Sequence, residues 1–254
     1  MSVFFHVGPL KISLITVTFN AGDTIQRCIE SVINQTFKNI EYIIIDGGST
    51  DNTVQNINRY EKYIQHFSSG PDQGIYDAMN KGIAFATGSV VGMLNADDFF
   101  ADNGILADVA TVFEDQNVQA LYGDLDFVNH MGNIFRKWRS GSYKPGIFNR
   151  GWMPPHPTFY CRRELFNKYG FYSLEYGTAA DYELMARFMH KHHLNPFYLE
   201  KVMVKMKVGG ASNKNLSSRV KGLLNDFKAM RKNGISLPLA AVFLKRARKL
   251  GQYL

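Results

Sequence analysis

Two adjacent carboxylates follow a short apolar run near the middle of the chain. Val90 to Leu94 has the composition of a buried strand, and Asn95-Ala96-Asp97-Asp98 comes directly after it. Neighbouring carboxylates at such a position are unfavourable unless a cation neutralises them. Mg²⁺ and Mn²⁺ suit this role, because they prefer oxygen ligands and keep coordination positions open for phosphate. Asp97 and Asp98 therefore indicate either a divalent-cation site or a solvated acidic turn, and a motif this short leaves both open.

Another carboxylate, Asp46, ends the apolar run Tyr42 to Ile45 and precedes Gly47-Gly48. It could accept hydrogen bonds from the N–H of a nucleobase or from a ribose hydroxyl. The alternative is a simple turn, because Asp before glycine is common where the chain reverses direction.

Asp181 stands at the start of a helical pattern that runs to His192. Its carboxylate could be a general base that deprotonates a substrate hydroxyl, or it could be a helix N-cap. His156 lies between two prolines and could contact a substrate or a phosphate, or be an ordinary loop histidine. The segment Asp72 to Gly82 is unusually polar for a helix and includes Asn80, an amide that is mildly unfavourable inside one.

The elements that must position these residues alternate between strands and helices in the first hundred residues. Apolar runs predict strands at 12–19, 42–45, 64–67 and 90–94, and helical spacing predicts helices at 25–33 and 74–86. This alternation predicts an α/β fold with a largely parallel, Rossmann-like sheet flanked by helices. Ligands collect at the carboxyl ends of such strands, so we expect Asn20, Asp46 and Asp97 to converge on one crevice.

The second half of the chain has a mixed pattern. We predict helices at 105–114, 163–169 and 181–192, strands at 120–125 and 197–208, a hairpin turning at 131–133 and a loop region at 141–157. Residues 209–215 resemble a flexible joint. We therefore predict a main domain over 1–213, followed by a basic helical tail over 214–254.

Composition and charge narrow the class of protein. The 254 residues are 45% hydrophobic and 20% charged, as in folded soluble proteins, and the two cysteines form no metal or redox motif. We read neither a signal peptide nor a membrane span, so we expect a cytoplasmic protein. The net charge of +7 is concentrated in residues 214–254, which carry ten Lys or Arg and one acid. The rest of the chain is nearly neutral, which argues against nucleic-acid binding by the main domain.

Five segments, in order and at the expected spacing, resemble the family 2 glycosyltransferases, which have the GT-A fold. They are the strand Ile12 to Asn20, the turn Ile45 to Thr53, the helix Gly74 to Gly82, Asn95-Ala96-Asp97-Asp98, and Ala180-Asp181-Tyr182. One such motif is weak evidence, whereas five in order over roughly residues 10–205 are strong. The sequence is therefore similar to enzymes that transfer a sugar from a nucleotide sugar to an acceptor hydroxyl, in particular to those that build bacterial surface polysaccharides.

The resemblance implies that 1–213 is a catalytic domain, with a nucleotide-binding half at about 10–100 and an acceptor half at about 101–213. It also implies a role for each candidate residue. Thr18 and Asn20 would line the nucleotide pocket, and Asp46 would bind the base, usually uracil. Asp97 and Asp98 would hold Mn²⁺ or Mg²⁺, and Asp181 would be the catalytic base of an inverting, single-displacement reaction. We group Asp72, Asn80 and Asn95 with the residues that bind the nucleotide sugar, and His156 with possible acceptor or phosphate contacts.

Three positions depart from the family pattern. Asn95 replaces the first acid of the metal motif, Met79 replaces a frequent arginine, and Ala180 replaces an acid before the base. Without the arginine, the family pattern indicates less about which nucleotide is bound. With Asn95 in place of the first acid, metal binding depends more on Asp97.

Other functions stay open at this point. A nucleotide-sugar-binding protein without catalysis would keep Asp46 and Asp97, although an intact Asp181 argues against it. A dinucleotide-dependent oxidoreductase would need a glycine fingerprint after the first strand, where this chain has Asn20-Ala21-Gly22-Asp23. Residues 216–254 combine apolar and basic positions at helical spacing. This pattern predicts either contact with an anionic membrane, where lipid-linked acceptors are found, or packing on the catalytic domain.

Overall fold

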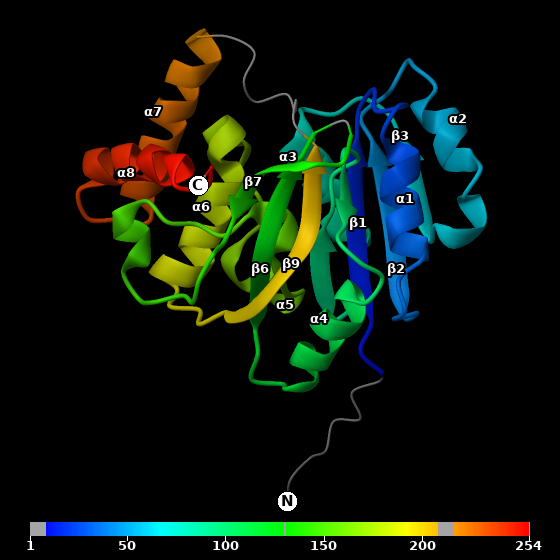
Figure 1. Ribbon diagram of the computed structural model, residues 1–254, viewed down its shortest axis with the longest axis horizontal. Helices are drawn as coiled ribbons and strands as arrows, with labels where there is room; N and C mark the ends of the chain where they lie inside the picture. The colour runs from blue at the N-terminus through cyan, green and yellow to red at the C-terminus, as the bar shows by residue number, and fades with distance from the viewer. Residues whose placement is uncertain (1–8, 130, 208–215, 254) are drawn as a thin grey trace, which may run out of the picture.

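In the computed structural model, which describes residues 9–129, 131–207 and 216–253, a nine-stranded sheet carries helices on both faces (Figure 1). The strands are β1 (Ile12–Thr18), β2 (Ile40–Asp46), β3 (His66–Ser69), β4 (Val90–Met93), β5 (Asp98–Phe100), β6 (Ala120–Val128), β7 (Ile134–Trp138), β8 (Tyr160–Arg162) and β9 (Phe197–Lys207). The helices are α1 (Ile25–Ile33), α2 (Thr53–Asn58), α3 (Ile75–Phe85), α4 (Ile105–Glu114), α5 (Glu164–Tyr169), α6 (Ala180–Met185), α7 (Leu216–Lys232) and α8 (Pro238–Leu250). Short helical turns are η1 (Glu61–Tyr63), η2 (Ile147–Arg150), η3 (His156–Thr158), η4 (Leu174–Ala179) and η5 (Ala186–Lys191).

The strands follow the order β3-β2-β1-β4-β8-β6-β9-β5, and β7 also pairs with β6. The strands β1 to β4 run parallel to one another, as do β6 and β9, whereas β5, β7 and β8 pair antiparallel. The predicted fold class is confirmed: a mostly parallel sheet flanked by helices, with a helical C-terminal region.

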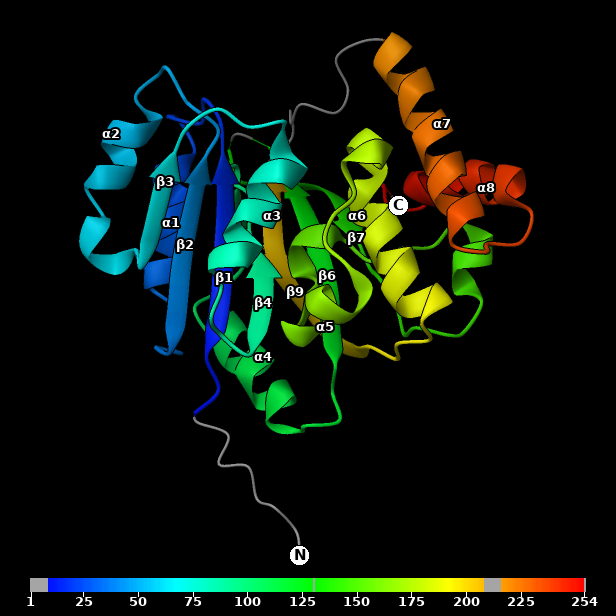
Figure 2. The same cartoon turned by 180° about the vertical axis from the view of Figure 1, so that it is seen from behind.

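The alternation of side chains along β1 divides the core between the two faces of the sheet. Ile15 and Val17 join the cluster under α3, α5 and α6, and Ile12 and Leu14 join the cluster under α1 and α4. Figure 2 shows the first face and Figure 1 the second. A strand that is apolar on both faces is typical of a parallel sheet covered on each side.

Two strands were missed by the sequence analysis. The strands β5 and β8 have three residues each, too few to show a period, and they form because they pair with β9 and with β4 and β6. The consequence for the site is that Asp98 begins a strand, whereas the sequence suggested a turn over Asn95 to Asp98. The predicted joint at 209–215 lies outside the described residues.

The helices α7 and α8 pack on the rest of the chain. Ala229, Met230, Ala241 and Val242 are buried in the same cluster as α6, and α8 crosses η2 so closely that a side chain at Gly151 would overlap its backbone. This packing agrees with one of the two interpretations of the basic region. Among the described helices, none combines the length and the apolar composition that crossing a membrane requires.

Candidate functional site

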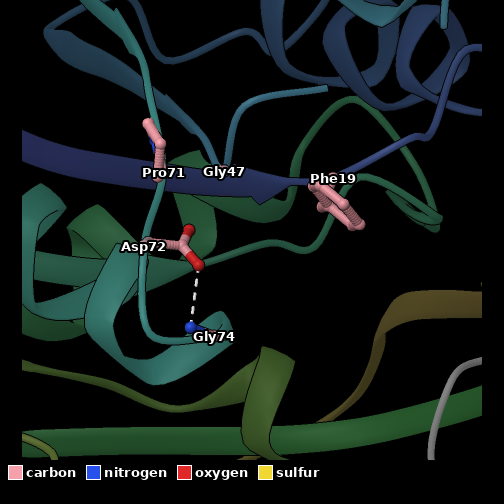
Figure 3. A pocket seen from close by; sticks show the side chains of 5 residues that line it. All are labelled: Phe19, Gly47, Pro71, Asp72 and Gly74. Carbon is pink, nitrogen blue, oxygen red and sulfur yellow. Dashed lines mark hydrogen bonds between the residues drawn. The ribbon is translucent and has the colours of Figure 1, made fainter. Parts of the chain in front are cut away.

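A pocket opens at the carboxyl ends of β1 and β2 (Figure 3). Phe19, Gly47, Pro71, Asp72 and Gly74 line it. Asp72 accepts a hydrogen bond from the backbone N–H of Gly74 at 2.7 Å, and its other oxygen lies 2.7 Å from where a Cβ of residue 47 would stand. A side chain at Gly47 would therefore displace the carboxylate of Asp72 from its place in the wall of the pocket.

Asp46 is buried beside this pocket and organises the loop that follows β2. Its Oδ2 accepts hydrogen bonds from the N–H groups of Gly48 and Ser49 and from the hydroxyl of Ser69, and its Oδ1 accepts one from the hydroxyl of Ser49. The side chain is 1% exposed. The turn interpretation of Asp46 is thus confirmed, while base recognition stays a prediction.

The end of β1 supplies the next two predicted residues. Asn20 has a left-handed backbone (φ 48°), and its side-chain oxygen accepts a hydrogen bond from the N–H of Thr50 at 2.9 Å. The hydroxyl of Thr18 is buried and has no partner among the described residues. Asn20 therefore fixes the loop after β2, and Thr18 keeps an unused hydrogen-bonding group at the end of its strand.

The two adjacent carboxylates lie in different environments. Asp97 is partly exposed, whereas Asp98 has no exposed surface. Asp98 Oδ2 accepts a hydrogen bond from the side-chain amide of Asn95 at 3.1 Å, and Asp98 Oδ1 and Asn95 Oδ1 are buried without a partner in the described structure. Of the two carboxylates predicted to hold a metal, only Asp97 is accessible.

Burial and mutual repulsion govern the ionisation of this pair. Burial raises the pKa of Asp98 well above its usual range, and the charge of Asp97 raises it further. Burial also raises the pKa of Asp97, while the ammonium of Lys207 at the end of β9 opposes the rise. A cation bound at Asp97 would likewise stabilise the charged form of this carboxylate against burial. Within the described residues, no three His, Cys, Asp or Glu side chains are grouped as a complete metal site.

Asp181 lies in the first turn of α6. Ala179 occupies the N-cap position, so the alternative that Asp181 caps this helix is wrong. The carboxylate of Asp181 accepts the backbone N–H of Tyr182 at 2.7 Å and is partly exposed. It is therefore available to a substrate that enters beside α6.

His156 and two tyrosines surround Asp181. His156 Nε2 lies 3.1 Å from the hydroxyl of Tyr172, and the rings of Tyr172 and Tyr76 are 5.5 Å apart. Burial lowers the pKa of His156, although the nearby charge of Asp181 opposes the shift. Burial and the charge of Asp181 raise the pKa of Tyr76 well above its usual range. The three side chains facing Asp181, one imidazole and two phenols, are therefore uncharged.

Asn80 binds another part of the chain, whereas the sequence analysis grouped it with the residues that bind the nucleotide sugar. Its side-chain amide donates to the carbonyl of Tyr172 at 2.9 Å, and its side-chain oxygen accepts the N–H of Tyr172 at 3.0 Å. Because both ends of the amide are used, Asn80 joins α3 to the segment before η4. The polar residue that looked unfavourable in a helix is explained by this contact.

The structure brings most of the predicted residues to one edge of the sheet. The N–H of Gly47 donates to the carbonyl of Thr18 at 2.9 Å, and the N–H of Ala96 to the carbonyl of Val17 at 3.3 Å, so the ends of β2 and β4 meet at β1. The sequence analysis gave no role to Phe19 or Tyr76. Phe19 is 64% exposed directly after a buried strand, and a large aromatic in that position was the available signal.

Comparisons with known proteins agree with this arrangement. The family model described as Glycosyl transferase family 2 matches residues 13–176. A PGL/p-HBAD biosynthesis glycosyltransferase from Mycobacterium tuberculosis is 33% identical over 208 residues, which cover 79% of this chain and 78% of that protein. Chondroitin synthase from Pasteurella multocida is 31% identical over 131 residues, which cover 51% of this chain and 14% of the synthase.

Two solved structures share the fold. Residues 1–349 of TarS from S. aureus, in complex with UDP, superpose with a TM-score of 0.68 at 21% identity, covering 89% of this chain and 65% of that one. The mannosyltransferase PcManGT from Pyrobaculum calidifontis, in complex with GDP-Man and Mn²⁺, gives a TM-score of 0.67 at 16% identity, covering 94% and 72%. This chain thus spans slightly less than two thirds of the TarS fragment.

The contact between Asn80 and Tyr172 predicts a stability effect. Asn80→Ala removes two hydrogen bonds and leaves two backbone groups unpaired, so we expect the free energy of unfolding to fall by about 1–3 kcal/mol. Urea unfolding followed by tryptophan fluorescence measures the change. Asn58→Ala, at the exposed end of α2, is the matched control and should be near neutral. An Asn80→Ala protein as stable as the control would show that the amide is not needed structurally.

Proposed function

The chain belongs to glycosyl transferase family 2 and is a glycosyltransferase, and from this we propose that it moves a sugar from a UDP-sugar to an acceptor hydroxyl with inversion at the anomeric carbon. The observation that carries the proposal is the juxtaposition of the pocket at the ends of β1 and β2 with Asp97 and Asp181. Gly74 at the start of α3 lines the pocket, and the charge of Asp181 raises the pKa of Tyr76 on the same helix.

The pocket suits a nucleoside. Phe19 and Pro71 offer apolar surface for a flat base, and the carboxylate of Asp72 offers a hydrogen-bond acceptor. We assign Asp46 a base-binding role that acts through the loop it holds, with Asn20 supporting that loop. TarS binds UDP and PcManGT binds GDP-Man; UDP is our choice for this chain, and release of nucleoside diphosphate from a panel of UDP- and GDP-sugars tests it.

The residues present fit a divalent cation. Mg²⁺ and Mn²⁺ are commonly held by one or two carboxylates together with substrate phosphates, so a complete protein cage is not needed. Asp97, the accessible carboxylate of the pair, would hold the ion, while Asp98 is buried and accepts a hydrogen bond from the amide of Asn95. When bound, the ion supplies positive charge to the diphosphate leaving group. PcManGT was solved with Mn²⁺, which favours that ion.

Asp181 is the general base of the proposed reaction. It takes the proton of the acceptor hydroxyl as the new bond from the acceptor oxygen to the anomeric carbon forms. The bond from that carbon to the diphosphate oxygen breaks at the same time, and its electron pair leaves with UDP. The carboxylate of Asp181 is partly exposed, and we assign the neighbouring His156 a contact with the acceptor or a phosphate.

The acceptor we propose is a lipid-linked or polysaccharide intermediate of a bacterial surface glycan. The relatives named for PGL/p-HBAD biosynthesis and chondroitin synthesis support a glycan product. We keep the division into a catalytic domain at 1–213, with donor and acceptor halves, and a basic helical region at 214–254 that packs on the acceptor half.

The outer face of α8 suits contact with an anionic membrane. Leu239, Phe243 and Leu250 recur on it and are 64%, 72% and 72% exposed. Arg246, Arg248 and Lys249 lie on the same helix, and each Lys or Arg near an anionic surface adds about 1 kcal/mol of attraction. We propose that α8 places the enzyme on the cytoplasmic face of the membrane. Because Val242 and Ala241 hold the other side of α8 in the core, point substitutions test this better than removal of the helix.

Metal removal gives the first test of the reaction. Excess chelator should abolish UDP release from the best donor of the panel, and added Mn²⁺ should restore it. Asp97→Asn should lower turnover by at least about 100-fold, because a metal contributes several kcal/mol to the transition state. Glu114→Gln, which changes an exposed acid at the end of α4, is the control. Full activity in excess chelator contradicts the metal assignment.

The base has its own test. Asp181→Asn keeps the side-chain oxygen that accepts the N–H of Tyr182 but cannot take a proton, so kcat should fall by about 10²–10⁴. UDP affinity, measured by calorimetry, should not change, because Asp181 does not line the nucleotide pocket. Glu164→Gln, an exposed acid on α5, is the control and should keep full activity. A near-normal kcat for Asp181→Asn rules out this base.

Vesicle binding tests the outer face of α8. The protein should sediment with phosphatidylglycerol vesicles at low salt, and Phe243→Glu should lose this binding while its UDP release without membranes stays normal. Met131→Glu makes the same change at an 81% exposed position on another surface and should keep binding. A protein that ignores these vesicles even at low salt, where charge attraction is strongest, contradicts membrane contact.

A further inference from the structure

A second pocket, of about 370 Å³, opens where β6 and β9 begin. The strand β6 is antiparallel to β8, and β8 is antiparallel to β4, so β6 and β9 start at the same edge of the sheet as β1 and β4. The donor pocket lies at the other edge, where β1 and β2 end. Because β6 has nine residues, the two edges are about 30 Å apart along this strand. The second pocket is therefore separate from the donor pocket.

Three segments that are distant in the sequence form the walls of this second pocket. They are 117–118 before β6, 142–143 after β7 and 195–198 at the start of β9. The carbonyl of Val118 accepts a hydrogen bond from Arg162 Nε at 3.1 Å, and the carbonyl of Gly141 accepts one from the hydroxyl of Tyr122 at 2.8 Å. These bonds to neighbouring strands hold two of the three walls in place.

The aromatic rings of the pocket are Tyr143, Phe197 and Tyr198. The hydroxyl of Tyr143 donates to the carbonyl of Met189 at 2.8 Å, and the hydroxyl of Tyr198 donates to Asp124 Oδ1 at 2.9 Å. Phe197 is 44% exposed. Because both hydroxyls already donate to the protein, the rings are held in place and offer mainly apolar surface to a ligand.

Polar groups stand beside these rings. The side chains of Asn117, Ser142 and Asn195 are exposed at the pocket. Those of Ser142 and Asn195 make no hydrogen bond with any described residue. Among the described residues that line the pocket, none is Asp, Glu, Lys, Arg or His.

This lining favours an uncharged ligand that has both apolar faces and hydroxyl groups. A phosphate or a nucleotide would call for Arg or Lys, which bind such anions. An acyl chain would leave the amides and the hydroxyl without partners. A sugar ring has C–H faces that pack on aromatic side chains and hydroxyls that bond to amides. Apolar walls with a few polar groups that fix orientation are typical of small-ligand sites of this size.

We propose that this pocket binds a sugar unit of a neutral glycan at the edge of the sheet opposite the catalytic site. The glycan is the acceptor or product of the proposed function, and for that identity the inference rests on the proposed function. Binding itself requires no turnover. A chain held here is retained through a unit that is remote from the end being extended.

The test is a titration of the full-length protein with neutral trisaccharides, followed by saturation-transfer NMR. The probes are maltotriose, cellotriose, mannotriose and N,N′,N″-triacetylchitotriose. We expect saturable binding of at least one of them. Saturating UDP should not change the Kd, because the donor pocket is at the other edge of the sheet.

Two substitutions assign the binding to this pocket. Phe197→Ala should raise the Kd at least about tenfold, because it removes an apolar face, and Asn195→Ala should raise it about three- to tenfold. Phe85→Ala, at a 46% exposed position at the end of α3, is the matched control and should bind like the native protein. Nucleoside diphosphate release by all three variants should stay normal, which shows that they are folded. If Phe197→Ala fails this check, Asn195→Ala, which lies outside any strand, decides the test.

The outcomes separate this inference from the proposed function. The inference is overturned if no trisaccharide binds, or if the folded variants bind as tightly as the native protein. Asp181→Asn should bind the trisaccharide with the native Kd, because this pocket does not include the base. A protein that binds a trisaccharide but releases no nucleoside diphosphate contradicts the proposed function alone. One that releases it but binds no trisaccharide contradicts this inference alone.

Discussion

The buried carboxylate of Asp46 is the interaction on which the donor side depends. A carboxylate removed from water is strongly unfavourable unless hydrogen bonds replace its hydration. Asp46 obtains them from the loop after β2 and from Ser69 at the end of β3. The loop therefore has one conformation, which places Gly47 against Asp72 and the pocket beside the end of β1. Apolar packing stabilises the sheet, whereas the hydrogen bonds of Asp46 fix the loop at the edge of the sheet.

The helix α3 connects the donor side to the chemistry. Gly74 at its start lines the pocket, and Asn80 two turns further along the chain holds Tyr172. Met79 and Ile83 pack the helix on the sheet. One rigid element thus joins the pocket to the segment near Asp181, the two parts of the site that we propose for the nucleotide and the base.

Sequence patterns could predict the parts of this fold that depend on local chemistry. The runs 12–19 and 42–45 are apolar on both faces, and the residues that end them lie where a parallel sheet puts them. The three-residue strands β5 and β8 could not be predicted, because only pairing with distant strands stabilises them. The same reason hides the environments of Asp97 and Asp98, which look alike in sequence and differ through burial. The partner of Asn80 lies 92 residues away and has no local signal.

The burial of residues from α7 and α8 in the core under α6 has a consequence for synthesis of the protein. Met230 and Val242 share that core with Met185 and Ala186. The apolar surface around α6 therefore stays exposed to water until Met230 and Val242 have been synthesised. The strands β1 to β4 pair with one another within the first hundred residues and can begin to do so while the ribosome is still working. The half that carries Asp181 must wait for more than fifty further residues, and during that interval it is the part of the nascent chain most in need of a chaperone.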